Sequence, residues 1–144
     1  MSRYKLSLIV CLFLTPFLIS AGEYEGAVQA KILLKTTTTG SGDPIAYLKT
    51  DQPEVTVMKV DIAPGAETGW HTHPVPVYAY VLAGTLTVNI EGHKSLTFNE
   101  GDVIIEVMNT RHNGHNTGKV PVRLIVFYTG AKADMANVVR TAAP

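Results

Sequence analysis

The chain has 144 residues, and its 12 basic and 12 acidic side chains give a formal net charge of zero. No basic stripe or run occurs in it, which argues against nucleic acid as a partner. The length suits one domain with a proper hydrophobic core.

Residues 1–22 have the layout of a secretory signal peptide. Arg3 and Lys5 precede an apolar run of about fifteen residues, which ends in small residues at positions 20–22. The alternative is a retained membrane anchor, but the run is shorter than the roughly twenty residues that span a bilayer, and Pro16 interrupts it. We expect cleavage before Glu23, export to the periplasm or out of the cell, and no membrane attachment afterwards.

Cleavage there would remove Cys11, the only cysteine. A mature chain without cysteine has no disulfide, no thiol catalysis and no cysteine-based zinc site.

Short β-rich segments separated by turn clusters make up the chain after the leader. Residues 55–62 are the clearest of these segments, because apolar and polar side chains alternate there with the period of a half-buried strand. The other segments are residues 27–35, 44–49, 78–82, 85–90, 96–98, 103–107 and 122–128. A short helix is conceivable only at residues 132–139. We therefore predict an all-β antiparallel sandwich or barrel, with an N-terminal arm at residues 23–42 and one domain at residues 43–144.

The histidines suggest a metal site. In an extended segment His71 and His73 share one face, and prolines on both sides constrain the backbone. His112 follows a predicted strand that could return the chain to the same region. Three neutral imidazoles can bind a divalent transition metal (iron, manganese, nickel, copper or zinc) and leave positions open for water or substrate. The alternative is a solvated pair of loop histidines.

The spacing of these residues resembles the two motifs of the cupin family. Gly65, five residues and the pair His71-Thr72-His73 lead to Gly84, and Gly101-Asp102 leads to His112 and Asn116. The resemblance covers residues 55–128. It implies a jelly-roll cupin β-barrel, dimer formation, and metal-dependent oxygenase, isomerase, decarboxylase or other lyase chemistry on a small organic acid or enol.

The chain departs from these motifs at three positions. Val77 stands where metal-binding cupins usually have a glutamate ligand, while Val107 and Asn109 replace a proline and a glycine. Loss of the glutamate removes one ligand and one negative charge. The resemblance thus leaves open a site that holds no metal.

Glu106 could replace the lost carboxylate. It interrupts the apolar segment 103–107 and by alternation shares a face with Ile104. If that face lines the barrel interior, Glu106 points toward His112, where a metal or a charged histidine would offset the cost of burying it. The alternative is a charge on the outer face.

Other polar and aromatic side chains are candidates for smaller roles. We expect Tyr78 and Tyr80 to lie on opposite faces of their strand, so that at most one points inward, as a catalytic or a core residue. Arg111 could hold an anionic substrate or be an exposed cation. His115 could lie at the pocket rim, whereas His93, alone in a turn, should be exposed.

Two kinds of function fit these residues. One is a metal-dependent enzyme that acts on a small molecule. The other is a non-catalytic periplasmic or secreted cupin that binds a metal or small ligand, which the loss of the glutamate at Val77 favours. An open polar cavity with Glu106 near the histidines would favour the enzyme.

Overall fold

The computed structural model describes residues 27–132 and 138–144. Contacts divide the chain into two compact units, residues 1–31 and 32–144. In the first unit the described residues, 27–31, are exposed and belong to no strand. The predicted leader at residues 1–22 lies outside the described residues, so export and the boundaries 1–22, 23–42 and 43–144 stay predictions.

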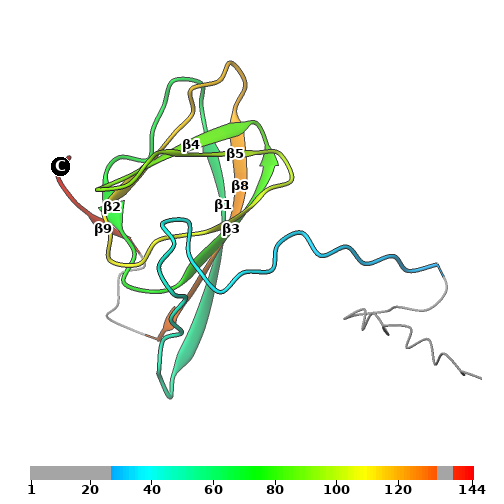
Figure 1. The fold of residues 1–144 in the computed structure, drawn as a ribbon, viewed down its shortest axis with the longest axis vertical. Helices are drawn as coiled ribbons and strands as arrows, with labels where there is room; N and C mark the ends of the chain where they lie inside the picture. The colour runs from blue at the N-terminus through cyan, green and yellow to red at the C-terminus, as the bar shows by residue number, and fades with distance from the viewer. Residues whose placement is uncertain (1–26, 133–137) are drawn as a thin grey trace, which may run out of the picture. The chain divides into compact units, whose positions relative to one another are not determined.

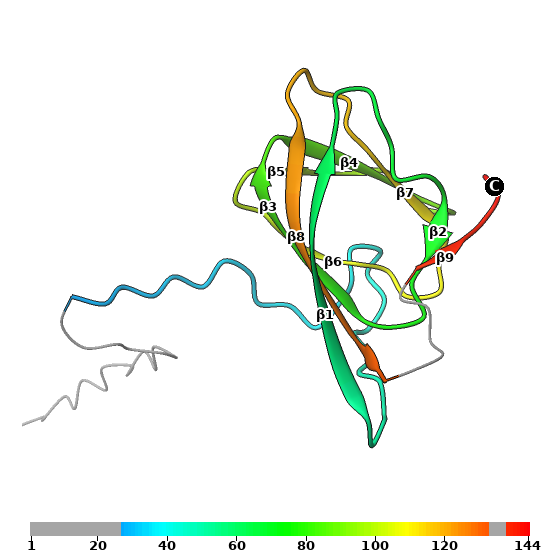
Figure 2. The same cartoon turned by 180° about the vertical axis from the view of Figure 1, so that it is seen from behind.

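The second unit is built from antiparallel strands in two sheets (Figures 1 and 2). One sheet has the order β1 (Pro53–Ile62), β8 (Val122–Ala131), β3 (Val77–Ala83) and β6 (Val103–Ile105). The other has the order β5 (Leu96–Asn99), β4 (Thr85–Ile90), β7 (His112–His115), β2 (His71–Thr72) and β9 (Val139–Arg140). No described residue is helical, so none belongs to a helix that could cross a membrane. The all-β class expected from the sequence is confirmed.

Alternation along β3 shows how the sequence defines the core. Val77, Ala79 and Val81 are buried and belong to one hydrophobic cluster, while Tyr78 and Tyr80 are half-buried on the other face. Residues two apart on a strand point the same way. Our expectation of one tyrosine on each face was therefore wrong, and neither points into the core.

Six predicted segments overlap the strands β1, β3, β4, β5, β6 and β8, but the segments 27–35 and 44–49 form none. Apart from an isolated bridge between Thr38 and Pro44, these segments have no strand to pair with among the described residues. β-propensity alone does not form a strand without a packing partner. Most of the helix predicted at residues 132–139 lies outside the described residues, and Val139 is in β9.

Two backbone positions allow tight turns, one in the loop before β7 and one between β3 and β4. Asn109, at the glycine position of the second motif, has a φ of 53°, a left-handed conformation that asparagine tolerates better than most residues. Its N–H donates to the carbonyl of His73 at 2.9 Å. Gly84 has a φ of 81°, and a Cβ there would lie 2.8 Å from the carbonyl oxygen of Pro121. Asn109 and Gly84 thus both adopt a left-handed conformation at positions where the two cupin motifs have a glycine.

Candidate metal centre

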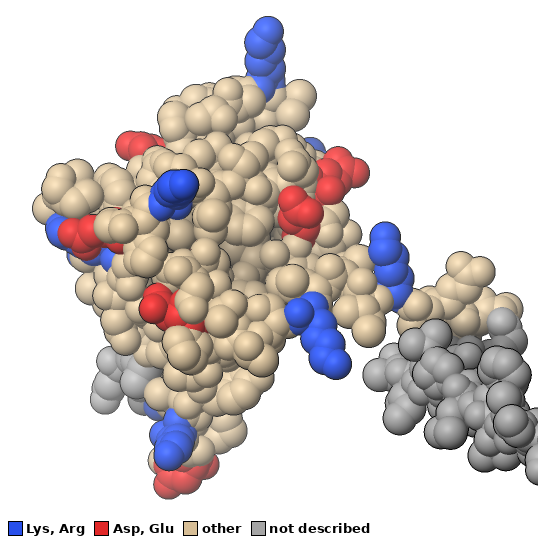
Figure 3. All heavy atoms as spheres, viewed as in Figure 1, with Lys and Arg blue, Asp and Glu red and all other residues tan. Residues whose placement is uncertain are grey.

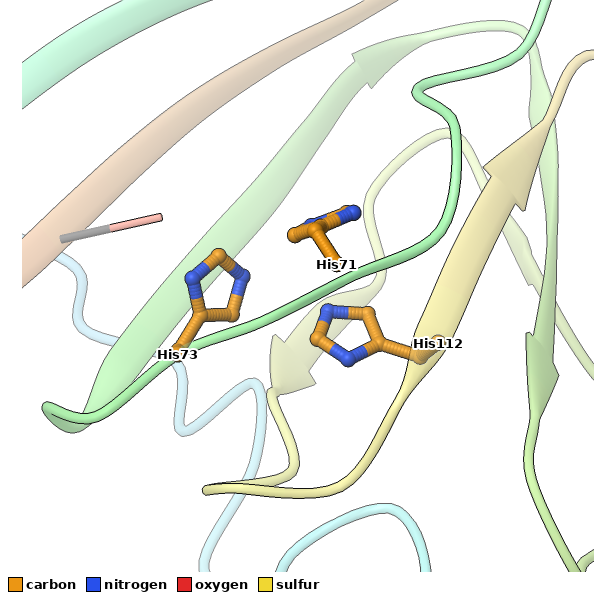
Figure 4. A group of neighbouring side chains, drawn as sticks. All are labelled: His71, His73 and His112. Carbon is orange, nitrogen blue, oxygen red and sulfur yellow. The ribbon is translucent and has the colours of Figure 1, made fainter. Parts of the chain in front are cut away.

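Strand pairing brings the three histidines together. His71 on β2 is directly opposite His112 on β7, and opposed residues of an antiparallel pair point to the same face. His73 follows His71 by two residues, and Figure 4 shows the three rings turned toward one another. Their possible ligand nitrogens all lie within 4.8 Å of one another. The ring centroids of His71 and His112 are 4.3 Å apart.

Backbone carbonyls orient two of the rings. Nδ1 of His71 lies 2.7 Å from the oxygen of Gly69, and Nδ1 of His112 lies 2.9 Å from that of Thr110. A carbonyl only accepts hydrogen bonds, so Nδ1 donates in both rings. In the neutral ring Nε2 then keeps its lone pair, which is the usual arrangement in metal-binding histidines.

Burial keeps these imidazoles neutral. It lowers the pKa of His71 from 6.5 to about 4, and it also lowers the pKa of His112. Both rings are therefore uncharged at neutral pH. Neutral imidazole is the form that binds metal, so no proton has to be removed from either ring first.

Glu106 comes from the strand that faces Val77. The β3–β6 register pairs Tyr78 with Ile105, and the N–H of Glu106 donates to the carbonyl of Val77 at 3.0 Å. Glu106 and Val77 are thus cross-strand neighbours. The Glu106 side chain is 14% exposed, and its Oε2 lies 3.6 Å from Nε2 of His112. Burial raises the pKa of Glu106 to about 7. The carboxylate that the family usually has at position 77 is missing, and the Glu106 carboxylate lies on the neighbouring segment of the sheet.

The environment of His112 fits a bound cation. Its Nε2 is buried and has no hydrogen-bond partner among the described residues, which ordinarily costs about 1–3 kcal/mol. A cation held by His71, His73 and His112 would satisfy this nitrogen and offset the charge of Glu106. Imidazole nitrogens with one carboxylate suit zinc, iron, manganese, nickel or copper. The residues present thus fit a divalent transition metal without selecting one.

A cavity of about 210 Å³ opens beside the histidines. Met58, Val60, Leu124 and Val126 form much of its apolar wall, whereas the histidines and Glu106 contribute polar groups. Tyr128 also lines it, with its ring 5.6 Å from that of His73. The arrangement leaves room for a small molecule next to the histidines.

The other predicted candidates lie away from this cavity. Tyr78 lines a separate small pocket, and neither Tyr80 nor His115 lines the cavity, while His93 is exposed. Arg111 is engaged by Glu91 in a two-pronged ion pair, which raises the pKa of Arg111 and lowers that of Glu91. On the face seen in Figure 3, basic and acidic side chains are scattered and in places adjacent, and neither sign forms a continuous patch.

Among the cavity-lining residues that were not predicted from the sequence, Tyr128 and Arg140 carry polar groups that could contact a ligand. Alternation could have found Tyr128, because Leu124, Val126 and Tyr128 are the buried positions of one strand face. Nothing in the local sequence pointed to Arg140, which reaches the cavity through the pairing of β9 with β2.

Comparison with known proteins places residues 58–128 in a family described as the cupin domain. No curated protein matches the chain. The solved DMSP lyase DddQ from Ruegeria pomeroyi DSS-3 is 26% identical, with a TM-score of 0.51, over 72% of this chain and 48% of its own.

Two other solved structures show the same fold at lower identity. A cupin-like protein from Thermotoga maritima is 20% identical over 62% of this chain and 65% of its own, with a TM-score of 0.52. Oxalate decarboxylase from Lactobacillus farciminis, in a formate complex, is also 20% identical, with a TM-score of 0.52, over 60% of this chain and 26% of its own. This chain thus spans under half of DddQ and about a quarter of the decarboxylase.

Proposed function

The chain carries a domain of the cupin superfamily, and on that premise we propose that it is a metal-dependent enzyme acting on a small organic acid or enol. His71, His73 and His112 would hold the divalent metal, with Glu106 beside them. One observation carries the proposal: a buried Nε2 of His112 without a hydrogen-bond partner faces the Glu106 carboxylate at the edge of an open cavity.

The residues of the cavity suit proton transfer next to a ligand oxygen that the metal would polarise. A bound divalent metal supplies Lewis acidity toward a carbonyl or carboxylate oxygen. Burial raises the pKa of the Glu106 carboxyl to about 7 in the metal-free protein, and this carboxylate at the edge of the cavity can accept a proton at Oε2 and return it. The apolar wall excludes water from the rest of the ligand. Among oxygenase, isomerase and lyase chemistry, a carboxylate that moves protons favours isomerase or lyase chemistry.

The likeness to DddQ supports the lyase class, because that protein is a DMSP lyase. The likeness to oxalate decarboxylase supports the fold alone. The proposal therefore names a reaction class and leaves the substrate to experiment.

Val77 favours a second candidate, a periplasmic or secreted protein that binds a metal or small ligand without turnover. The family's usual carboxylate position holds an apolar, fully buried side chain here. Under this alternative Glu106 would only balance the charge of the metal.

Turnover assays on metal-loaded protein distinguish the two candidates. The protein is stripped with chelator, titrated with zinc, nickel, copper, manganese and iron, and incubated with a panel of small organic acids followed by NMR. We expect conversion of at least one acid, lost on stripping and reduced at least tenfold in Glu106→Gln. Tight metal binding without conversion of any acid would favour the binding protein. Absence of metal binding would refute the enzyme and would leave only a protein that binds a small ligand.

We also propose that the chain is exported and cleaved before Glu23, and that it forms a homodimer. The basic start and the apolar run support export, and the family resemblance supports the dimer. Mass spectrometry of protein from its native compartment should find Glu23 as the first residue. Light scattering should give twice the mass of the mature chain.

A further inference from the structure

The C-terminal strand β9 brings a cation to the cavity. This strand lies beyond residues 58–128, which match the family, and it pairs with β2. Arg140 is directly opposite His71, and the N–H of Thr141 donates to the carbonyl of Trp70 at 3.0 Å. Because opposed residues of an antiparallel pair point to the same face, Arg140 lies on the cavity side, next to His71.

The contacts of Arg140 hold its guanidinium at the cavity mouth. Its Nη1 donates to the carbonyl of Thr68, and Thr68 and Arg140 both line the cavity. Gly69 leaves space for it, because a Cβ there would lie 3.3 Å from Nη1. Burial is the main cause that lowers the pKa of His71, and the nearby charge of Arg140 contributes to that shift.

Among the described residues, Arg140 also lacks the acidic partner that two other arginines have. Arg111 pairs with Glu91, and Arg123 with Asp61 at 3.3 Å. Within the part of the chain that the structure describes, no carboxylate lies within ion-pair distance of Arg140, and its one hydrogen bond uses one of five donors. The remaining donors are available to a ligand in the cavity.

We propose that Arg140 binds the carboxylate of a small organic acid whose short apolar chain packs on Met58, Val60, Leu124 and Val126. The proposal rests on the proposed function, which supplies the metal beside the same cavity. The guanidinium fork matches the two oxygens of a carboxylate. The cavity of about 210 Å³ is smaller than most ligand pockets, roughly 300–1,000 Å³, so an acid of a few carbons fits it best.

Calorimetry with butyrate on zinc-loaded protein tests this inference, with butyramide as the uncharged probe of the same shape. We expect butyrate to bind and butyramide to bind far more weakly. Loss of a charged hydrogen bond costs roughly 1.5–3 kcal/mol. Arg140→Gln should therefore weaken butyrate binding roughly ten- to hundredfold. The butyrate affinity of Arg140→Lys should lie between those of the unaltered protein and Arg140→Gln, because lysine keeps the positive charge and lacks the guanidinium fork.

Arg123→Gln is the matched control, because it removes an exposed arginine from the outer face of β8. It should bind butyrate as the unaltered protein does. Melting temperatures of all variants report folding, and zinc affinity is measured on each before butyrate is added.

The outcomes separate this inference from the proposed function. Zinc bound by Arg140→Gln together with a large loss of butyrate affinity supports both. If zinc binds but butyrate binds Arg140→Gln as tightly as the unaltered protein, the role of Arg140 is refuted and the metal site stands. The same conclusion holds if zinc binds but butyrate binds neither protein. If no zinc binds but butyrate binds in an Arg140-dependent way, the metal site is refuted and the role of Arg140 stands.

Discussion

The aliphatic strands of the fold and the pair β2 and β7 bury different kinds of side chain. The sheet of β1, β8, β3 and β6, together with β4 of the other sheet, contributes aliphatic groups to the core, such as Val81 and Leu86. The strands β2 and β7 of the other sheet bury His71, His112 and Asn113 instead. A buried CH₂ group contributes about 0.8 kcal/mol, whereas a buried polar group costs free energy unless it is paired. The aliphatic strands therefore stabilise the fold, and their stability offsets the cost of burying the polar side chains of β2 and β7.

Truncation of the aliphatic core should have the largest effect. Ile104 is 2% exposed and lies on β6, two residues before Glu106. Ile104→Ala leaves a cavity, and we expect a loss of about 2–5 kcal/mol in the free energy of unfolding, measured with urea with or without metal. Val55→Ala is the control, because Val55 is 60% exposed. Equal effects of the two substitutions would contradict the assignment of the core.

The charge of Glu106 should reduce the stability of the metal-free protein above neutral pH. Its pKa is raised from 4.5 to about 7, so the folded state favours the protonated form. The loss of stability that comes from burying the Glu106 charge is absent below about pH 4.5, grows between pH 4.5 and 7, and is complete above pH 7. Metal-free Glu106→Gln should therefore be more stable than the unaltered protein at about pH 8, by at most about 3 kcal/mol.

The same substitution should weaken metal binding, because a neutral amide is a poorer ligand for a divalent cation than a carboxylate. Urea titrations and metal competition on one pair of proteins measure both effects. Below about pH 4 the two proteins should be equally stable. If Glu106→Gln changes neither the stability nor the metal affinity at any pH, Glu106 does not act at the site.

His71 has the opposite pH dependence in the metal-free protein. Its pKa falls from 6.5 to about 4, so the folded state disfavours the charged ring. The loss of stability that comes from charging the buried ring is absent above about pH 6.5 and grows as the pH falls toward 4. Acid should therefore destabilise the metal-free fold at His71 and, through competition by protons, also release the metal.

Bound metal should offset the cost of the buried histidines. A ligand that binds only the folded state stabilises it by about 2.7 kcal/mol at a hundred times its Kd. We expect the melting temperature at neutral pH to rise when metal is added to stripped protein, and the increment to vanish steeply in mild acid. His71→Ala and His112→Ala should abolish the increment. His93→Ala, on an exposed turn, should leave it intact.

The same contrast explains what the sequence could predict. β-rich segments between turn clusters predicted β1, β3, β4 and β8, and along β3, β4 and β8 the burial of one face follows a period of two. The alternation seen in the sequence of β1 did not mark its buried face, because Val55 is exposed. The strands β2, β7 and β9 carry few apolar residues, and they were missed. Motif spacing still brought His71, His73 and His112 to attention. Arg140 could not be predicted, because its place depends on which strand the C-terminus pairs with.

The smallest effect is expected at Asn109, in the loop that joins the two kinds of region. Its φ of 53° lies in the left-handed region, which costs most residues roughly 1–2 kcal/mol and costs asparagine less. Asn109→Ala should therefore lower the free energy of unfolding by about 1 kcal/mol. Asn109→Gly should be neutral or nearly so, because glycine adopts this conformation readily.

The hydrogen bond from the N–H of Asn109 to the carbonyl of His73 makes this test specific to the site. Both substitutions retain the N–H, so the hydrogen bond can form in either variant. If the loop sets the position of His73, Asn109→Ala should weaken metal binding as well as stability, while Asn109→Gly should weaken neither. Equal metal affinities in the two variants, beside a clear difference in stability, would mean that the loop supports the fold and leaves the histidines unaffected.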